Sequence, residues 1–213
     1  MSETSHPIGC VIMASGLARR FGSNKLLADF GGRPLLCRAL DATDTQQLAC
    51  RIVVTRSAEV ETLCQTLGVA CLRHALPGRN DTVRLGLEAL LTLQPGLAGC
   101  IFLPGDQPLL RRETVEALVC AFVADTRTQK ETERAIFRLA FQAENDPEPL
   151  VGSPVLFGCG YFSALRTLPE GKGGSVLLRR YPERVCNVFT ADRAELLDAD
   201  TPEALRELKQ FLI

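Results

Sequence analysis

The sequence has no marked excess of charge of either sign. It carries 24 lysines and arginines against 25 acidic residues, for a formal net charge of −1. Without an overall basic field, and with arginine pairs too short to line a groove, it does not favour nucleic acid as a partner. Long apolar runs are also missing: none approaches the roughly 20 residues that a membrane-spanning helix needs. We therefore expect neither a nucleic-acid nor a membrane partner.

The sequence also has no secretory signal and no metal-binding cysteine pair. Residues 1–7 are polar and no apolar signal segment follows. The nine cysteines are odd in number, lie in apolar surroundings, and include no C-x-x-C pair. These features favour free, mostly buried thiols in a reducing, cytoplasmic protein.

Two familiar phosphate-binding motifs are absent as well. No G-x-G-x-x-G occurs, which argues against a classical dinucleotide-binding fold. A Walker loop needs a glycine directly before its lysine, but Ser23 and Asn24 separate Gly22 from Lys25. A phosphate site in this chain must therefore be built in another way.

What is present is an alternation of strand and helix signals. The predicted strands cover residues 8–14, 51–55, 69–72 and 100–103, and the predicted helices cover residues 34–42, 57–67, about 80–93 and 113–124. In the second, less regular part, we predict strands at residues 135–141, 154–157, 185–188 and 195–197, and helices at residues 161–168, 175–180 and 201–212. The alternation predicts an α/β fold with a mostly parallel sheet covered on both faces. With 213 residues and neither repeat nor linker, we expect one domain over residues 1–213.

The loop after the first strand is the first candidate site. Ligands of open parallel sheets bind at the carboxyl edge, where this loop lies. Its glycines allow close approach to phosphates, and Arg20 and Lys25 add positive charge. A surface loop with incidental charges is the alternative. The position after the first strand favours a triphosphate site.

Two acidic positions could hold a metal ion. Asp106 ends a predicted buried strand, although Pro-Gly-Asp also makes an ordinary turn. Near the C-terminus, Pro202 at the first helical position makes Thr201 the N-cap, which leaves Asp200 free. Asp198 is the alternative to Asp200, and an acidic residue beside a helix N-terminus needs no metal. Mg²⁺ takes one or two carboxylates together with phosphates and water.

In order, five segments resemble the MobA/MocA-like nucleotidyltransferases of molybdenum-cofactor biosynthesis, most closely the cytidylyl-transferring branch. They span most of the chain. The segments are Ser15-Gly16-x-x-x-Arg20-Phe21-Gly22-x-x-Lys25-Leu26-Leu27, Gly31 to Leu35, Asn80 to Leu87, Pro104-Gly105-Asp106-Gln107-Pro108, and Asp198 to Glu203.

The resemblance implies a Rossmann-like, three-layer αβα sandwich of the nucleotide-diphospho-sugar transferase type, with a mostly parallel, mixed sheet. It implies that Lys25 and Arg20 hold a triphosphate and that Asp106 and Asp200 bind Mg²⁺. It further implies a loop that faces the base and a helix start near the base and sugar. The residues concerned are Ala14, Ser15, Gly16 and Leu17 in the loop, and Asn80, Asp81 and Arg84 in the helix.

By the same resemblance, the reaction transfers a nucleoside monophosphate, CMP from CTP, to the phosphate of molybdopterin or molybdenum cofactor and releases pyrophosphate. A molybdoenzyme or its chaperone would be the further partner. A phosphate nucleophile is already ionised, so the presence of only two histidines is no objection, and His74 reads as an ordinary loop residue. Guanylyl-transferring relatives typically have an aspartate where Asn24 stands, which favours CTP.

The sequence departs from the family at three places. Ser15 replaces a small apolar residue or glycine, Ser153 stands where the family often has histidine, and Gly171 and Ser175 replace the aspartate and arginine of an Asp-Lys-Gly-Gly-Arg segment. The last two departures are expected to face the acceptor. The alternatives are therefore a GTP-using enzyme, a sugar- or polyol-phosphate nucleotidyltransferase, and a non-catalytic NTP-binding regulatory module.

Overall fold

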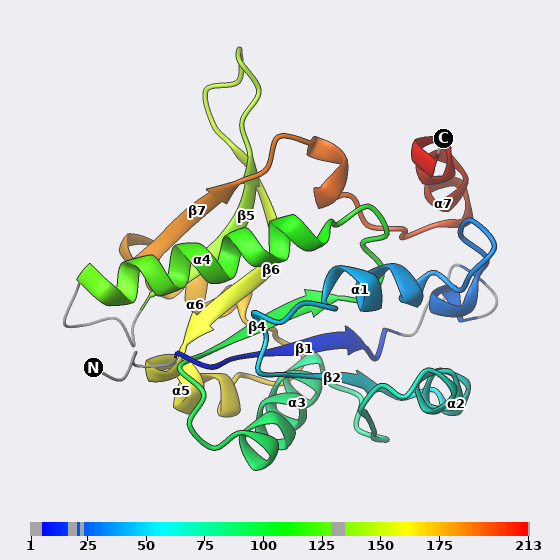
Figure 1. The fold of residues 1–213 in the computed structure, drawn as a ribbon, viewed down its shortest axis with the longest axis horizontal. Helices are drawn as coiled ribbons and strands as arrows, with labels where there is room; N and C mark the ends of the chain where they lie inside the picture. The colour runs from blue at the N-terminus through cyan, green and yellow to red at the C-terminus, as the bar shows by residue number, and fades with distance from the viewer. Residues whose placement is uncertain (1–5, 17–20, 22–23, 129–134, 213) are drawn as a thin grey trace.

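The computed structural model describes residues 6–16, 21, 24–128 and 135–212. They contain a seven-stranded sheet in the order β3-β2-β1-β4-β6-β5-β7 (Figure 1). The strands are β1 (Ile8–Ala14), β2 (Cys50–Thr55), β3 (Cys71–Arg73), β4 (Gly99–Pro104), β5 (Ile136–Phe141), β6 (Leu150–Gly158) and β7 (Val185–Phe189). Among the described residues, no helix has the length and apolarity needed to cross a membrane.

The sheet is mostly parallel but mixed. Strand β1 pairs in parallel with β2 and β4, and β3 and β7 are parallel to their neighbours β2 and β5. Only β6 runs the other way, antiparallel to both β4 and β5. The predicted fold class is confirmed.

Alternating side chains along the central strands serve two separate cores. In β1, Ile8, Cys10 and Ile12 join the core beneath α1 (Leu36–Ala42), α2 (Ala58–Thr66), α4 (Arg112–Thr128) and α7 (Pro202–Leu208), whereas Val11 joins the core on the other face. Helices α3 (Arg79–Leu93), α5 (Phe162–Arg166) and α6 (Ser175–Arg180) cover that second face. This period of two is what a strand buried on both faces requires.

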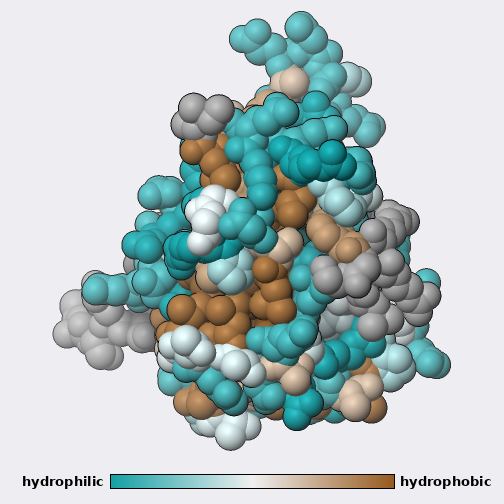
Figure 2. Space-filling view, turned by 90° about the vertical axis from the view of Figure 1, so that its right-hand side faces the viewer, coloured by the Kyte–Doolittle hydropathy of each residue, from teal (hydrophilic) through white to brown (hydrophobic). Residues whose placement is uncertain are grey.

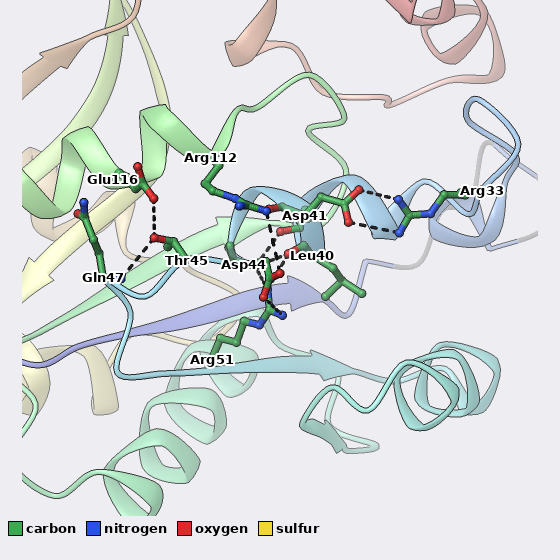
Figure 3. Close-up of polar contacts among 11 residues, drawn as sticks. Arg33, Leu40, Asp41, Asp44, Thr45, Gln47, Arg51, Arg112 and Glu116 are labelled. Atoms are coloured by element: carbon green, nitrogen blue, oxygen red, sulfur yellow. Dashed lines mark hydrogen bonds and ion pairs between the residues drawn. The ribbon is translucent and has the colours of Figure 1, made fainter.

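Polar contacts fasten α1 and the loop that follows it to β2 and α4 (Figure 3). Arg33 pairs with Asp41 at 2.8 Å, and Arg51 pairs with Asp44 at 2.8 Å. Thr45 donates to Glu116 on α4 at 2.6 Å. The loop that carries Thr45 leads into β2, so it lies at the amino edge of the sheet.

Some predicted boundaries were wrong for identifiable reasons. Residues 195–197 are not a strand: Asp192 caps a 3-10 helix, Arg193–Leu196, by accepting from the Ala194 amide at 2.9 Å. Helix α3 starts after Gly78 rather than after Asn80 or Asp81. The last helix ends at Leu208 and tightens into a 3-10 turn, Lys209–Leu212.

Candidate functional site

A cleft of about 1100 Å³ opens at the carboxyl edge, beside the ends of β1 and β4. Figure 2 looks onto this edge and shows a hydrophobic area framed by hydrophilic residues. The polar and charged residues that line the cleft come from widely separated segments. They are Ser15, Lys25, Arg56, Arg79, Thr82, Asp106, Ser153, Lys172, Ser175, Arg179, Asp198 and Asp200.

Lys25 lies between two of the predicted carboxylates. Its Nζ is 2.5 Å from Asp106 Oδ2 and 3.0 Å from Asp200 Oδ1, and only 11% of its side chain is exposed. Burial alone would lower the pKa of Lys25, but the two carboxylates outweigh it and the pKa is raised. The ammonium group therefore remains charged and is available to phosphate oxygens.

Local backbone structure explains why these three side chains meet. Asn24 accepts from the Leu26 amide at 3.1 Å and so starts the 3-10 turn Lys25–Leu27. The Ala199 amide donates to the Asp106 carbonyl at 2.9 Å, which joins the C-terminal segment to the end of β4. Thr201 caps α7 with Pro202 at the helix start, as predicted, and Asp200 is left 63% exposed.

Asp198 lines the cleft together with Asp106 and Asp200, and we call these three carboxylates the acidic wall. Burial, followed by the charges of Asp106 and Asp200, raises the pKa of Asp198 to about 6. Such crowding of carboxylates is relieved by a cation, and carboxylate oxygens suit Mg²⁺. No group of three or more potential protein ligands is preassembled within the described parts of the chain. The donor set therefore fits an ion that takes part of its coordination from phosphate and water.

The start of the first loop is held firmly. Ala14 is buried, and its carbonyl accepts from Thr55 at 3.0 Å, so it supports the loop rather than lining the cleft. Ser15 and Gly16 do line the cleft. Arg56 donates twice to the Ser15 carbonyl, at 2.9 and 2.5 Å. The predicted contacts of Leu17 and Arg20 lie outside the described residues.

At the start of α3, the cleft is lined by neighbours of the predicted residues. Gly78, Arg79 and Thr82 border it. The three predicted residues make structural contacts instead: Asp81 accepts from the Gly78 amide at 3.0 Å, Asn80 accepts from the Gly171 amide at 2.8 Å, and Arg84 pairs with Asp81 and Glu88. Contact between these three residues and a nucleotide remains a prediction.

The opposite wall combines the two segments that depart from the family pattern. A register shift between β5 and β6 falls at Ser153, which borders the cleft. The Asn80–Gly171 bond brings the glycine-rich segment 171–174 against α3. There a Cβ on Gly173 would be 2.8 Å from Arg79 Cδ. A side chain at position 173 would therefore require the Arg79 side chain to move.

The opposite wall is positively charged, because it carries Arg79, Lys172 and Arg179. The described part of the chain offers these three cations no ion-pair partner. Sequence reasoning missed Arg56, Arg79 and Arg179. Two signals were available: Arg56 directly follows a predicted strand, and Arg79 stands at a helix start, where positive charge is unfavourable.

A cleft at the carboxyl edge of an α/β sandwich, with a charged lysine beside paired carboxylates, is suited to a phosphorylated ligand such as a nucleotide. The chain belongs to the MobA-like NTP transferase family, whose domain matches residues 10–185. The resemblance found in the sequence is thus confirmed at the level of the family.

Three curated relatives with different names are similar to parts of the chain. The "Probable molybdenum cofactor guanylyltransferase" of Pyrococcus horikoshii is 26% identical over 52% of this chain and 54% of its own length. The "Bifunctional protein GlmU" of Anaeromyxobacter sp. is 34% identical over 57% and 26%. The "3-deoxy-manno-octulosonate cytidylyltransferase" of Polynucleobacter asymbioticus is 30% identical over 45% and 39%. The chain thus spans about half or less of these relatives.

Solved structures support the fold. A nucleotidyl transferase from Methanothermobacter has a TM-score of 0.75 at 20% identity, covering 97% of this chain and 98% of that one. Rv0371c from Mycobacterium tuberculosis has a TM-score of 0.74 at 22% identity, covering 96% and 98%. A second structure of Rv0371c, with a TM-score of 0.67 at 20% identity, is a complex with manganese and covers 96% and 98%. At these identities the likeness establishes the fold alone.

Proposed function

We propose that this chain is a Mg²⁺-dependent cytidylyltransferase that transfers CMP from CTP to the phosphate of molybdopterin or molybdenum cofactor. The observation that carries this proposal is the position of Lys25 between Asp106 and Asp200 in the cleft. It supplies the cation and the carboxylates that phosphoryl chemistry requires. We further propose that residues 1–213 form one domain, since all seven strands share one sheet.

In this mechanism, Lys25 and Arg20 bind the triphosphate of the donor beside the first loop. Asp106, with Asp200 or Asp198, holds Mg²⁺, which would neutralise charge on the phosphates. A phosphate oxygen of the acceptor forms a bond to the α-phosphorus, and the bond from that phosphorus to pyrophosphate breaks. The attacking oxygen is already ionised, so no side chain has to accept a proton.

A phosphorylated acceptor is supported by the charge of the cleft. Five of its lining residues are cations, namely Lys25, Arg56, Arg79, Lys172 and Arg179, against three carboxylates. Lys25 already faces two of the carboxylates, so the remaining positive charge suits an anionic second substrate. Molybdopterin meets this requirement, and a molybdoenzyme or its chaperone would receive the product. Nine free cysteines support a cytoplasmic setting.

The donor base is the less constrained part of the proposal. Asn24, which distinguishes the cytidylyl branch, caps the turn that carries Lys25, a task that an aspartate could perform equally. The named relatives include both a guanylyltransferase and a cytidylyltransferase. GTP is therefore the second candidate donor, and a sugar or polyol phosphate the second candidate acceptor.

Comparing kcat/KM for CTP and GTP by pyrophosphate release, at equal Mg²⁺ and molybdopterin concentrations, tests the donor. We expect CTP to be preferred, because unmatched polar edges make the wrong base costly by roughly 1–3 kcal/mol per lost buried hydrogen bond. A higher kcat/KM for GTP would overturn the cytidylyl assignment alone. Binding of an NTP without pyrophosphate release from any acceptor would favour the regulatory module.

A further inference from the structure

A small polar cluster lies behind the start of the first loop and has no role in the mechanism above. His74 Nε2 is 3.1 Å from Ser15 Oγ and 3.4 Å from Thr82 Oγ1. Ser15 follows β1, His74 follows β3, and Thr82 belongs to α3, so the imidazole joins three segments. Thr82 is buried, whereas Ser15 borders the cleft.

The hydrogen bonds of Ser15 indicate whether the His74 imidazole acts as donor or acceptor. Ser15 Oγ donates its only proton to the Val54 carbonyl at 3.1 Å. A further close contact to this oxygen must therefore bring a proton with it, so the imidazole donates from Nε2. With Arg56 bound to its carbonyl, Ser15 is held at both its side chain and its backbone.

The electrostatic setting of His74 indicates a neutral ring. Burial, followed by the charge of Arg56, lowers the pKa of His74; Asp81 opposes this shift, Arg84 adds to it, and the Leu76 backbone opposes it least. The imidazole is therefore uncharged near pH 7 and does not serve as a counter-ion for phosphate. Its contribution is positional.

We propose that His74 is a positioning residue for the nucleoside triphosphate, which acts by holding Ser15, and with it Gly16, in the geometry that receives the nucleotide. The proposal rests on the proposed function, because it assigns the loop to the donor. A backbone segment such as Ser15-Gly16 that is fixed before binding loses less conformational freedom when the ligand arrives, which increases affinity. It also explains why a hydroxyl stands at position 15: a small apolar side chain would leave the imidazole without this acceptor.

The test is calorimetric titration of the full chain with CTP, and separately with GTP, in Mg²⁺, using His74→Ala, Ser15→Ala, the double variant and His74→Gln. Loss of one neutral hydrogen bond corresponds to about a fivefold weaker Kd for each single alanine variant. The double variant is expected to lose less than the sum of the two single variants, since both changes remove the His74–Ser15 contact and only Ser15→Ala also removes the bond to Val54. His74→Gln retains a donor at similar reach and should bind like the wild type.

Thr45→Ala is the control for a general loss of stability, because Thr45 bonds to Glu116 at the amino edge, away from the cleft. It should leave the Kd unchanged whatever its effect on Tm. Unchanged nucleotide affinity in His74→Ala, additive losses in the double variant, or a glutamine variant as weak as alanine would each overturn the role of His74. A wild-type chain that binds neither nucleotide would instead overturn the proposed function, and this inference with it.

Discussion

At the level of single residues, Lys25 is central to the site because its ammonium group pairs with two carboxylates of the acidic wall, Asp106 and Asp200. We expect Lys25→Ala to reduce kcat about 100-fold or more, the usual cost of losing one preorganised electrostatic group. It should also lower the Tm of the unliganded protein, because Asp106 and Asp200 then repel each other, and added Mg²⁺ should restore part of that loss. Lys209→Ala, which removes an exposed pair with Asp29, is the matched control. If Lys25→Ala is inactive but its Tm does not change on addition of Mg²⁺, then repulsion between Asp106 and Asp200 is not what Lys25 relieves.

Three aspartates can be ranked by their dependence on Mg²⁺. We expect Asp106→Asn to abolish turnover at any Mg²⁺ concentration, and Asp200→Asn to raise the Mg²⁺ concentration needed for half-maximal rate more than Asp198→Asn does. Asp192→Asn is the control, since Asp192 pairs with Arg111 and does not line the cleft. The reverse order for the last two would make Asp198 the second ligand.

His74 also makes a prediction about stability and pH. Its pKa in the folded chain is below the ordinary value of 6.5, chiefly because of burial and Arg56. Below pH 6.5 the unfolded chain takes up a proton that the folded chain resists, so stability is full above this pH and falls as the pH falls toward the folded-state pKa. Between pH 7.5 and 5.5, Tm should therefore fall more in the wild type than in His74→Gln. Equal falls would show that the imidazole titrates normally.

At the scale of elements, the contact of α3 with β1 depends on one glycine. A Cβ at Gly86 would lie 2.6 Å from Val11 Cγ1, so Gly86→Ala forces helix and strand apart despite the better helix propensity of alanine. Overpacking of this kind costs about 1–3 kcal/mol, or about 2–4 °C of Tm per kcal/mol in a chain of this size. Gly96→Ala, with nothing within 4 Å of its Cβ, should melt like the wild type. A similar Tm for both variants would contradict the tight packing.

The elements that the sequence predicted well are those with a strong local signal. Strand β1 and helix α6 have the predicted bounds, and Thr201 caps a helix as expected. Strand β6 is longer than residues 154–157, because its outer half includes Gly152 and Ser153 and pairs across a register shift that no apolar pattern marks. Such pairing is decided by tertiary contact.

At the scale of the whole molecule, the carboxyl-edge rule brought Lys25, Asp106 and Asp200 together correctly, since it needs only strand order and local caps. The opposite wall could not be predicted in the same way. Arg79 and Lys172 are 93 positions apart in the sequence and meet there because Asn80 bonds to Gly171. Long-range placement of this kind depends on the complete packing of the two faces.

The most direct test of the central claim follows the phosphorus atoms of the donor. The chain is incubated with Mg²⁺, molybdopterin and CTP labelled either at the α- or at the γ-phosphorus, and the products are separated. We expect the α-label to appear on the acceptor and the γ-label in pyrophosphate, and we expect Asp106→Asn to form neither labelled product. A γ-label on the acceptor would make the chain a phosphotransferase, and pyrophosphate without any label on the acceptor would make it a hydrolase; either result would contradict nucleotidyl transfer.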